Sequence, residues 1–180
     1  MEYIHGKTLE DADLLHENYD EITNRIASIV SHLHSIQVNT KIPGPVGCGT
    51  PYDYIWGEDG AKMNFSSIEQ LNDYLNKRLK ILNKSIDLSV YPLVLCHMDL
   101  GRRNIILTPD DSIRLVDWAY AGLYPRFFEM AALPYLYHDN SAYRRSLVGT
   151  IKGEMRLTAE EEKHTDLIRR AAAASLRWVL

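Results

Sequence analysis

Apolar residues recur at helical spacing along three long stretches of the chain. One covers residues 18–36, a second begins near Ser66, and a third opens near Thr158 and runs towards the C-terminus. Two of them begin with a possible capping box, Ser66 with Glu69 and Thr158 with Glu161, in which a hydroxyl and a carboxylate satisfy free backbone N–H groups. The pattern predicts three amphipathic helices, each with an apolar stripe that faces a core.

Shorter apolar runs predict strands. The run at 93–95 is too short for a helix, and the runs at 105–107 and 113–116 flank a polar turn in the manner of a β-hairpin. Residues 1–9 are typical of a short strand that ends at a glycine turn and leads into an acidic segment able to begin a helix. Residues 127–137 favour a helix despite an internal proline. Helices outweigh strands, so the expected fold class is α+β, mostly α.

Two segments lack a regular pattern. Three prolines and three glycines crowd residues 43–51, which predicts an ordered surface loop without a helix over 43–60. The aromatic-rich stretch from Trp118 to Pro125 is also expected to be irregular. A chain of 180 residues with 46% hydrophobic content can bury one sizeable core, so we expect one domain or one lobe of a larger domain.

Composition and charge restrict the partners of the chain. A formal net charge of −4 gives no general attraction to nucleic acid or to an anionic membrane. The two cysteines, Cys48 and Cys96, do not amount to a disulfide framework and favour a reducing compartment. No apolar stretch reaches membrane-spanning length, and the first residues are acidic where a signal peptide is basic. We therefore expect a cytoplasmic protein with no nucleic-acid or membrane partner, and its oligomeric state stays open.

The residues that can carry chemistry concentrate in segment 93–118. Asp99 stands in a loop, Asn104 follows five positions later, and Asp117 comes after the next apolar strand. This order is typical of a kinase-type phosphoryl-transfer centre. Asp99 would accept or orient the acceptor proton, whereas oxygens of Asn104 and Asp117 suit Mg²⁺, a hard cation. Each residue alone is typical of a cap or a turn, but the ordered set predicts a site.

Neighbouring residues have predictions of their own. We expect His97 to hydrogen-bond to the backbone rather than to act in catalysis, and Trp118 to pack rather than to bind substrate. Arg102 and Arg103 either contact phosphate or are solvated.

A metallohydrolase is the alternative from another class of enzyme. His97 and Asp99 stand at positions i and i+2, where they could share a metal ion with His138 or Asp139. This hypothesis predicts tight transition-metal binding without nucleotide. The kinase-type hypothesis predicts weak Mg²⁺ binding that improves with ATP.

Several segments carry a family resemblance. EYIHGKTL at 2–9, the centre at 97–118 and AYAGLYP at 119–125 resemble the aminoglycoside phosphotransferase-like family of the protein-kinase-like fold. Residues 44–64 and the helix that ends near Leu79 resemble its fungal small-molecule phosphotransferase homologues. The resemblance covers nearly the whole chain.

The resemblance implies an architecture and a set of roles. Residues 1–180 would form the C-terminal lobe of a kinase-like phosphotransferase, with a small β-hairpin at the catalytic centre and the N-terminal lobe absent. Asp99 would be the catalytic residue, and Asn104 and Asp117 the metal ligands. Residues 1–9 would be the hinge segment, whose backbone meets adenine in this family.

The same resemblance implies cofactors and partners. The cofactor-binding residues would be Glu2, Tyr3, Ile4, Asn104 and Asp117. ATP and Mg²⁺ are the expected cofactors, and a small molecule with a hydroxyl group is the expected acceptor of the γ-phosphoryl group.

Two departures from the family pattern keep an alternative open. Ala119 stands where relatives commonly carry Glu, and the Gly-rich loop and strand Lys of an N-terminal lobe do not precede the hinge segment. The alternative is a non-catalytic binding or regulatory module that keeps the lobe without a working ATP site.

The acceptor is chosen in this family by loops and helices of the C-terminal lobe, here 52–59 and 120–139. These segments contain Asp53, Glu58, Glu129 and Asp139. The four acids either attract a cationic acceptor or are ordinary surface charges.

Overall fold

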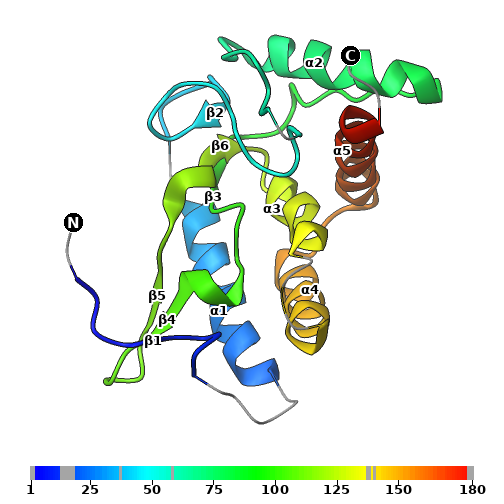
Figure 1. The fold of residues 1–180 in the computed structure, drawn as a ribbon. Helices are drawn as coiled ribbons and strands as arrows, with labels where there is room; N and C mark the ends of the chain where they lie inside the picture. The colour runs from blue at the N-terminus through cyan, green and yellow to red at the C-terminus, as the bar shows by residue number, and fades with distance from the viewer. Residues whose placement is uncertain are drawn as a thin grey trace.

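The computed structural model describes residues 3–12, 19–36, 38–57, 59–136, 139 and 141–177. Its helices are α1 (Asp20–Ser35), α2 (Ile68–Leu79), α3 (Phe127–Ala132), α4 (Ser141–Met155) and α5 (Ala159–Arg177). Its strands are β1 (Lys7–Thr8), β2 (Gly44–Pro45), β3 (Val94–Cys96), β4 (Ile105–Leu107), β5 (Ile113–Leu115) and β6 (Gly122–Tyr124). Turns of 3-10 helix occupy Lys80–Leu82, Arg102–Asn104, Trp118–Tyr120 and Leu133–Tyr135. Helices dominate, as the sequence predicts (Figure 1).

The strands form two small antiparallel sheets. One has the order β1-β4-β5, so the predicted hairpin of β4 and β5 carries the N-terminal strand on its other edge. The second has the order β2-β6-β3. Gly122 permits this second sheet, because a Cβ at this position would lie 2.8 Å from the Gly44 carbonyl oxygen and 2.2 Å from the Tyr124 ring.

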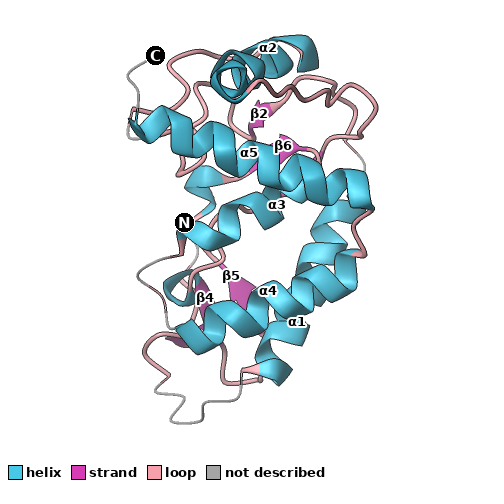
Figure 2. Cartoon of the chain, turned by 90° about the vertical axis from the view of Figure 1, so that its right-hand side faces the viewer, coloured by secondary structure: helices cyan, strands magenta, loops and turns pink. Residues whose placement is uncertain are grey.

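The helices pack as two groups. Helix α1 packs against α4, whereas α5 packs against α2 and α3 (Figure 2). Each group has its own cluster of buried apolar side chains, with Ile26, Val30 and Leu147 in the first and Leu75, Phe128 and Ile168 in the second. Among the described residues, no helix is long and apolar enough to cross a membrane.

The three long predicted helices are confirmed as α1, α2 and α5. At the start of α5 the capping box is reciprocal, because the Glu161 N–H donates to the Thr158 hydroxyl at 3.2 Å and the Thr158 N–H donates to the Glu161 carboxylate at 2.8 Å.

The box at α2 was predicted one residue too early. Ser67 is the N-cap and accepts the Gln70 N–H at 3.4 Å. The Gln70 side chain accepts the N–H of Ser66, the residue before the cap, at 2.9 Å, so the box is not reciprocal at a single cap residue.

Other predictions about the chain path need correction. The N-terminal strand follows Gly6 instead of preceding it. Gly6 lies close to the paired strand β4, because a Cβ at Gly6 would lie 2.5 Å from the Leu107 carbonyl oxygen. The helix predicted over 127–137 is α-helical only to Ala132 and continues as a 3-10 turn, because Pro134 supplies no N–H. Helix α4 was not predicted.

The described residues of segment 43–60 contain no helix, as predicted, but the segment is not a simple surface loop. It includes the short strand β2 and turns inward at Ile55 and Trp56, which are 2% and 1% exposed. Trp56 contacts the rings of Phe65, Tyr74 and Phe128. The loop therefore completes the core beneath α2.

Candidate active site

A tight loop between β3 and β4 folds two of the predicted site residues inward. Met98 adopts a left-handed φ of 70°, and the Asn104 N–H donates to the Gly101 carbonyl at 2.9 Å. The Asn104 side-chain amide donates to the Asp99 carbonyl at 3.0 Å. Asp99 and Asn104 are each 3% exposed.

The backbone of Val116 links this loop to the third predicted residue. Its N–H donates to the Asn104 carbonyl at 2.9 Å, so Asp117 follows directly after a residue that is bonded to Asn104. Asp117 is exposed and has φ 58° and ψ 70°. A left-handed conformation is uncommon for residues other than glycine and is concentrated at functional sites.

His97 hydrogen-bonds to the backbone, as predicted. Its Nε2 lies 3.1 Å from the Val116 carbonyl oxygen, and its Nδ1 accepts the Asp99 N–H at 3.3 Å. These partners assign the proton to Nε2. Burial lowers the pKa of His97, which keeps the imidazole neutral. The ring of Trp118 packs edge-on against His97 at 4.6 Å, although Trp118 is 42% exposed.

The two carboxylate oxygens of Asp99 have different surroundings. Oδ2 accepts a hydrogen bond from Arg103 Nη2 at 2.6 Å, which is an ion pair. Oδ1 is buried and has no hydrogen-bond partner within the described part of the chain. An unpartnered buried carboxylate oxygen costs free energy unless a ligand group reaches it. One oxygen is therefore held in place while the other stays available as a proton acceptor.

Glu129 fixes the start of this loop from α3. Its two carboxylate oxygens accept the N–H groups of His97 at 2.7 Å and of Met98 at 2.9 Å. Glu129 is 0% exposed, and burial raises its pKa to about 7. From the sequence this acid was expected either to attract a cationic acceptor or to be a surface charge. It is neither, because it anchors the backbone of the loop.

Two of the other acidic residues in the predicted acceptor segments, Asp53 and Asp139, have hydrogen-bond partners in the structure. Asp53 is buried, and its carboxylate accepts the Ile55 N–H at 2.6 Å and the Trp56 Nε1–H at 3.0 Å, so it stabilises the inward turn of its loop. Asp139 accepts the Arg102 N–H at 2.7 Å and also pairs with the Arg102 guanidinium. Glu58 lies outside the described residues.

Two of the metal ligands that the metallohydrolase hypothesis names, His97 and Asp139, are otherwise engaged. Both ring nitrogens of His97 are bonded to the backbone, which leaves no lone pair for a metal ion. Asp139 is neutralised by Arg102. His138 lies outside the described residues.

Four tyrosines form an aromatic group next to the Asp99–Arg103 pair. Tyr120 contacts Tyr52 and Tyr54, with ring centroids 6.2 and 5.8 Å apart, and Tyr54 stacks on Tyr135 at 6.1 Å. The Tyr54 side chain also lies near the Arg103 guanidinium and contributes to the raised pKa of Arg103. Sequence inspection did not find this group, because its members are spread over more than eighty positions.

The predicted hinge segment lies against the hairpin that follows Asn104. Lys7 and Thr8 pair with Leu107 and Ile106 of β4, and the Leu9 N–H donates to the Ile105 carbonyl at 2.7 Å. Of the predicted adenine-binding residues, Glu2 lies outside the described residues, Tyr3 is 76% exposed and Ile4 is half-buried.

The donor set at Asn104 and Asp117 suits a hard divalent cation. Because the amide nitrogen of Asn104 is bonded to the Asp99 carbonyl, its oxygen is the atom left to coordinate a ligand. Asp117 is exposed and follows Val116, whose N–H is bonded to the Asn104 carbonyl. One amide oxygen and one carboxylate can hold Mg²⁺ while phosphate oxygens and water complete its octahedron.

The profile of the choline/ethanolamine kinase family matches residues 1–170. The chain belongs to this family. The sequence resemblance had pointed to the aminoglycoside phosphotransferases, which are related to this family. The family match supports a kinase-like phosphotransferase. The narrower assignment to the aminoglycoside phosphotransferases stays a prediction.

Solved structures of this kind resemble the chain at low identity. The choline kinase LicA from Streptococcus pneumoniae is 20% identical, with a TM-score of 0.49, over 96% of this chain and 58% of that one. A Plasmodium vivax ethanolamine kinase is also 20% identical, with a TM-score of 0.47, over 97% and 54%. The ADP-bound aminoglycoside phosphotransferase APH(2'')-Ib is 15% identical, with a TM-score of 0.39, over 97% and 72%.

The chain thus spans a little over half the length of the choline and ethanolamine kinase structures. A comparison with curated proteins gave no match.

Proposed function

We propose that this chain carries the catalytic lobe of an ATP-dependent phosphotransferase, which transfers the γ-phosphoryl group of ATP to the hydroxyl of a small amino alcohol of the choline or ethanolamine type. The observation that carries the proposal is the state of Asp99. One of its oxygens is bonded to Arg103 and the other is buried without a partner, in a loop tied to Asn104 and Asp117.

The chain's own residues account for positioning and for proton transfer. Asp99 Oδ1 accepts the proton of the acceptor hydroxyl as its oxygen attacks the γ-phosphorus, and the bridging oxygen leaves on ADP. Asn104 and Asp117 would hold Mg²⁺, which neutralises charge on the phosphate groups. Glu129 and His97 hold the backbone around Asp99, so that the carboxylate does not have to reorganise during the reaction.

The aromatic group supports an acceptor with a cationic head. Tyrosine faces attract quaternary ammonium groups through cation–π interactions, and this recognition needs no hydrogen bond from the ligand. The group includes Tyr54, which is close enough to Arg103, the ion-pair partner of Asp99, to influence its pKa, so an amino alcohol bound there would bring its hydroxyl towards Asp99. The resemblance to the aminoglycoside phosphotransferase-like family makes an aminoglycoside the alternative acceptor. The resemblance to fungal homologues likewise makes a fungal origin a prediction.

Phosphoryl transfer from [γ-³²P]ATP to choline and ethanolamine, measured with the wild-type chain and with Asp99→Asn, tests the proposal. We expect transfer by the wild type and a loss of about 100-fold or more in kcat for the variant, the range of a general base. The variant should keep its thermal unfolding midpoint within a few degrees. Full activity of Asp99→Asn would disprove the assignment of the base. No transfer by a well-folded wild type would favour the non-catalytic module.

A further inference from the structure

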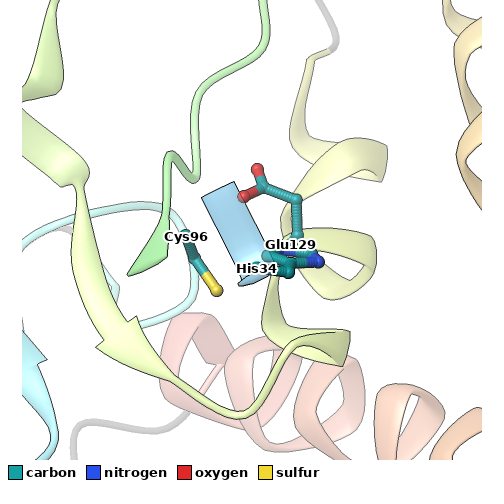
Figure 3. A group of neighbouring side chains, drawn as sticks. All are labelled: His34, Cys96 and Glu129. Atoms are coloured by element: carbon teal, nitrogen blue, oxygen red, sulfur yellow. The ribbon is translucent and has the colours of Figure 1, made fainter. Parts of the chain in front are cut away.

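Three side chains that can bind a transition metal face one another behind the active-site loop. His34 comes from the last turn of α1, Cys96 ends β3, and Glu129 lies in α3 (Figure 3). One ligand atom from each residue lies within 4.8 Å of the other two. Cys96 and Glu129 are 0% exposed, so the cluster is part of the interior.

The interior satisfies these groups unequally. His34 Nε2 is buried and has no hydrogen-bond partner among the described residues. Cys96 Sγ forms long hydrogen bonds of 3.9 Å with the carbonyl oxygens of Val94 and Tyr124, whereas the Glu129 carboxylate accepts two backbone N–H groups. Buried polar atoms are normally paired, so an unpaired imidazole nitrogen beside a thiol and a carboxylate requires a physical explanation.

The charges of the cluster fit a divalent cation. Burial lowers the pKa of His34 to about 4, so the imidazole is neutral and keeps a lone pair. A thiolate and a carboxylate together would balance a doubly positive ion, and the buried site would then carry no net charge. Without a cation, burial raises the pKa of Cys96 well above its ordinary value and keeps the thiol protonated. Metal binding would release that proton.

We propose that His34, Cys96 and Glu129 form a three-ligand site for a divalent transition metal of the zinc type. Thiolate, imidazole and carboxylate are ligands of Zn²⁺, whereas Mg²⁺ and Ca²⁺ select oxygen donors alone. The site is therefore distinct in chemistry from the oxygen donors at Asn104 and Asp117.

The proposed metal ligands lie next to the start of the loop that carries Asp99. Glu129 binds the N–H groups of His97 and Met98 with the same carboxylate, and His97 follows Cys96 directly. A carboxylate oxygen has two lone pairs, so it can accept an N–H and coordinate a metal at once. The ion would fasten α1, β3 and α3 together at the base of the loop that carries Asp99.

Titration of the chelator-treated chain with Co²⁺, and then with Zn²⁺ in competition, tests this site. We expect one equivalent to bind, a thiolate-to-cobalt charge-transfer absorption, and a higher unfolding midpoint with Zn²⁺. Cys96→Ser and His34→Gln should each weaken Zn²⁺ binding by about 100-fold or more, since loss of a supporting residue alone can cost 10- to 100-fold. The matched controls are Cys48→Ser and His32→Gln, which change exposed residues and should bind as the wild type does.

Two results would overturn the proposal. One is a folded wild-type chain that gives no charge-transfer band and no stoichiometric uptake. The other is binding that survives in both Cys96→Ser and His34→Gln but falls in a control, which would place the metal on the surface. The cobalt spectrum of the wild type does not depend on how well any variant folds.

Discussion

Arg103 and Asp99 form an ion pair within a single turn of the loop, with Nη2 2.6 Å from Oδ2. Asp99 is almost fully buried, whereas the Arg103 side chain is 43% exposed. The pair therefore fixes a buried carboxylate from the solvent side. Arg103 was expected to contact phosphate or to be solvated, and in this structure its partner is the proposed base.

This pair makes Arg103 a positioning residue. In Arg103→Leu the Asp99 carboxylate loses its only ion pair among the described residues and is free to rotate, so kcat should fall by about 10- to 100-fold. The kcat of Arg103→Lys should fall less than that of Arg103→Leu, because a lysine keeps the charge, although it lacks the planar donor group. Steady-state kinetics measure both, with Arg114→Ala, a change at an exposed position of β5, as the control. Equal kcat in the wild type and Arg103→Leu would argue against this role.

The Glu129 anchor predicts a linked loss of stability and activity. The N–H groups of His97 and Met98 bond to different oxygens of Glu129, so in Glu129→Gln the amide oxygen keeps one of them and the NH₂ group faces the other donor. An unsatisfied buried donor costs about 1–3 kcal/mol of unfolding free energy. Urea denaturation in EDTA isolates this effect from any bound metal.

The control for this change is Glu160→Gln, at an exposed position in the first turn of α5. It should alter the unfolding free energy by less than about 0.5 kcal/mol. A Glu129→Gln chain as stable as the wild type would show that the two hydrogen bonds contribute little.

Asp53 predicts a specific pH dependence of stability. Burial raises its pKa to about 7, whereas an unfolded Asp titrates near about 3.9. Between these values the folded chain keeps a proton that the unfolded chain has lost, so this group's contribution to the unfolding free energy falls as pH rises from about 4 to 7. Below about 4 both states are protonated, and above about 7 neither is.

Asp53→Asn removes that titration and also loses one of the two acceptors that serve Ile55 and Trp56. The variant should therefore be less stable than the wild type, and the difference should be larger at pH 5 than at pH 8. Denaturation curves at both pH values measure it, with Asp73→Asn, which changes an exposed residue of α2, as the control. A difference that is the same at both pH values, or larger at pH 8, would contradict the assignment.

The aromatic group predicts how the acceptor is recognised. In Tyr120→Leu the central ring is lost, and the KM for choline should rise roughly 2- to 30-fold, the range of a cation–π interaction. Tyr120→Phe keeps the ring and should stay close to the wild type. The uncharged isostere 3,3-dimethylbutanol provides a second comparison, because its KM should not respond to the loss of the ring. An equal rise in the KM of both acceptors would indicate that the variant has changed the shape of the site and not its recognition of the positive charge.

Asp99, Asn104 and Asp117 could be proposed as a site from the sequence because their order and spacing lie within one short segment. The same segment forms the predicted hairpin of β4 and β5. Glu129 could not be recognised in this way, since its partners His97 and Met98 are about thirty positions away and a lone acid in a helix usually marks a solvated face. Its burial is set by tertiary packing alone.

Helix α4 shows a similar limit for the fold. It contains Gly149 and Gly153, which lower helix propensity, and its buried residues Tyr143, Leu147 and Ile151 give only a narrow stripe. Packing against α1 supplies the stability that the local sequence lacks. The buried turn at Trp56 likewise depends on aromatic contacts with distant segments.

Calorimetric titration of the chain with ATP, with and without Mg²⁺, tests whether Asp117 and its neighbours form a nucleotide site, and Asp117→Ala is the matched variant. We predict saturable binding that requires Mg²⁺ and is lost in Asp117→Ala, because Asp117 would supply the carboxylate that holds the ion. A well-folded chain that does not bind ATP, or that binds it equally well after Asp117→Ala, would contradict the account.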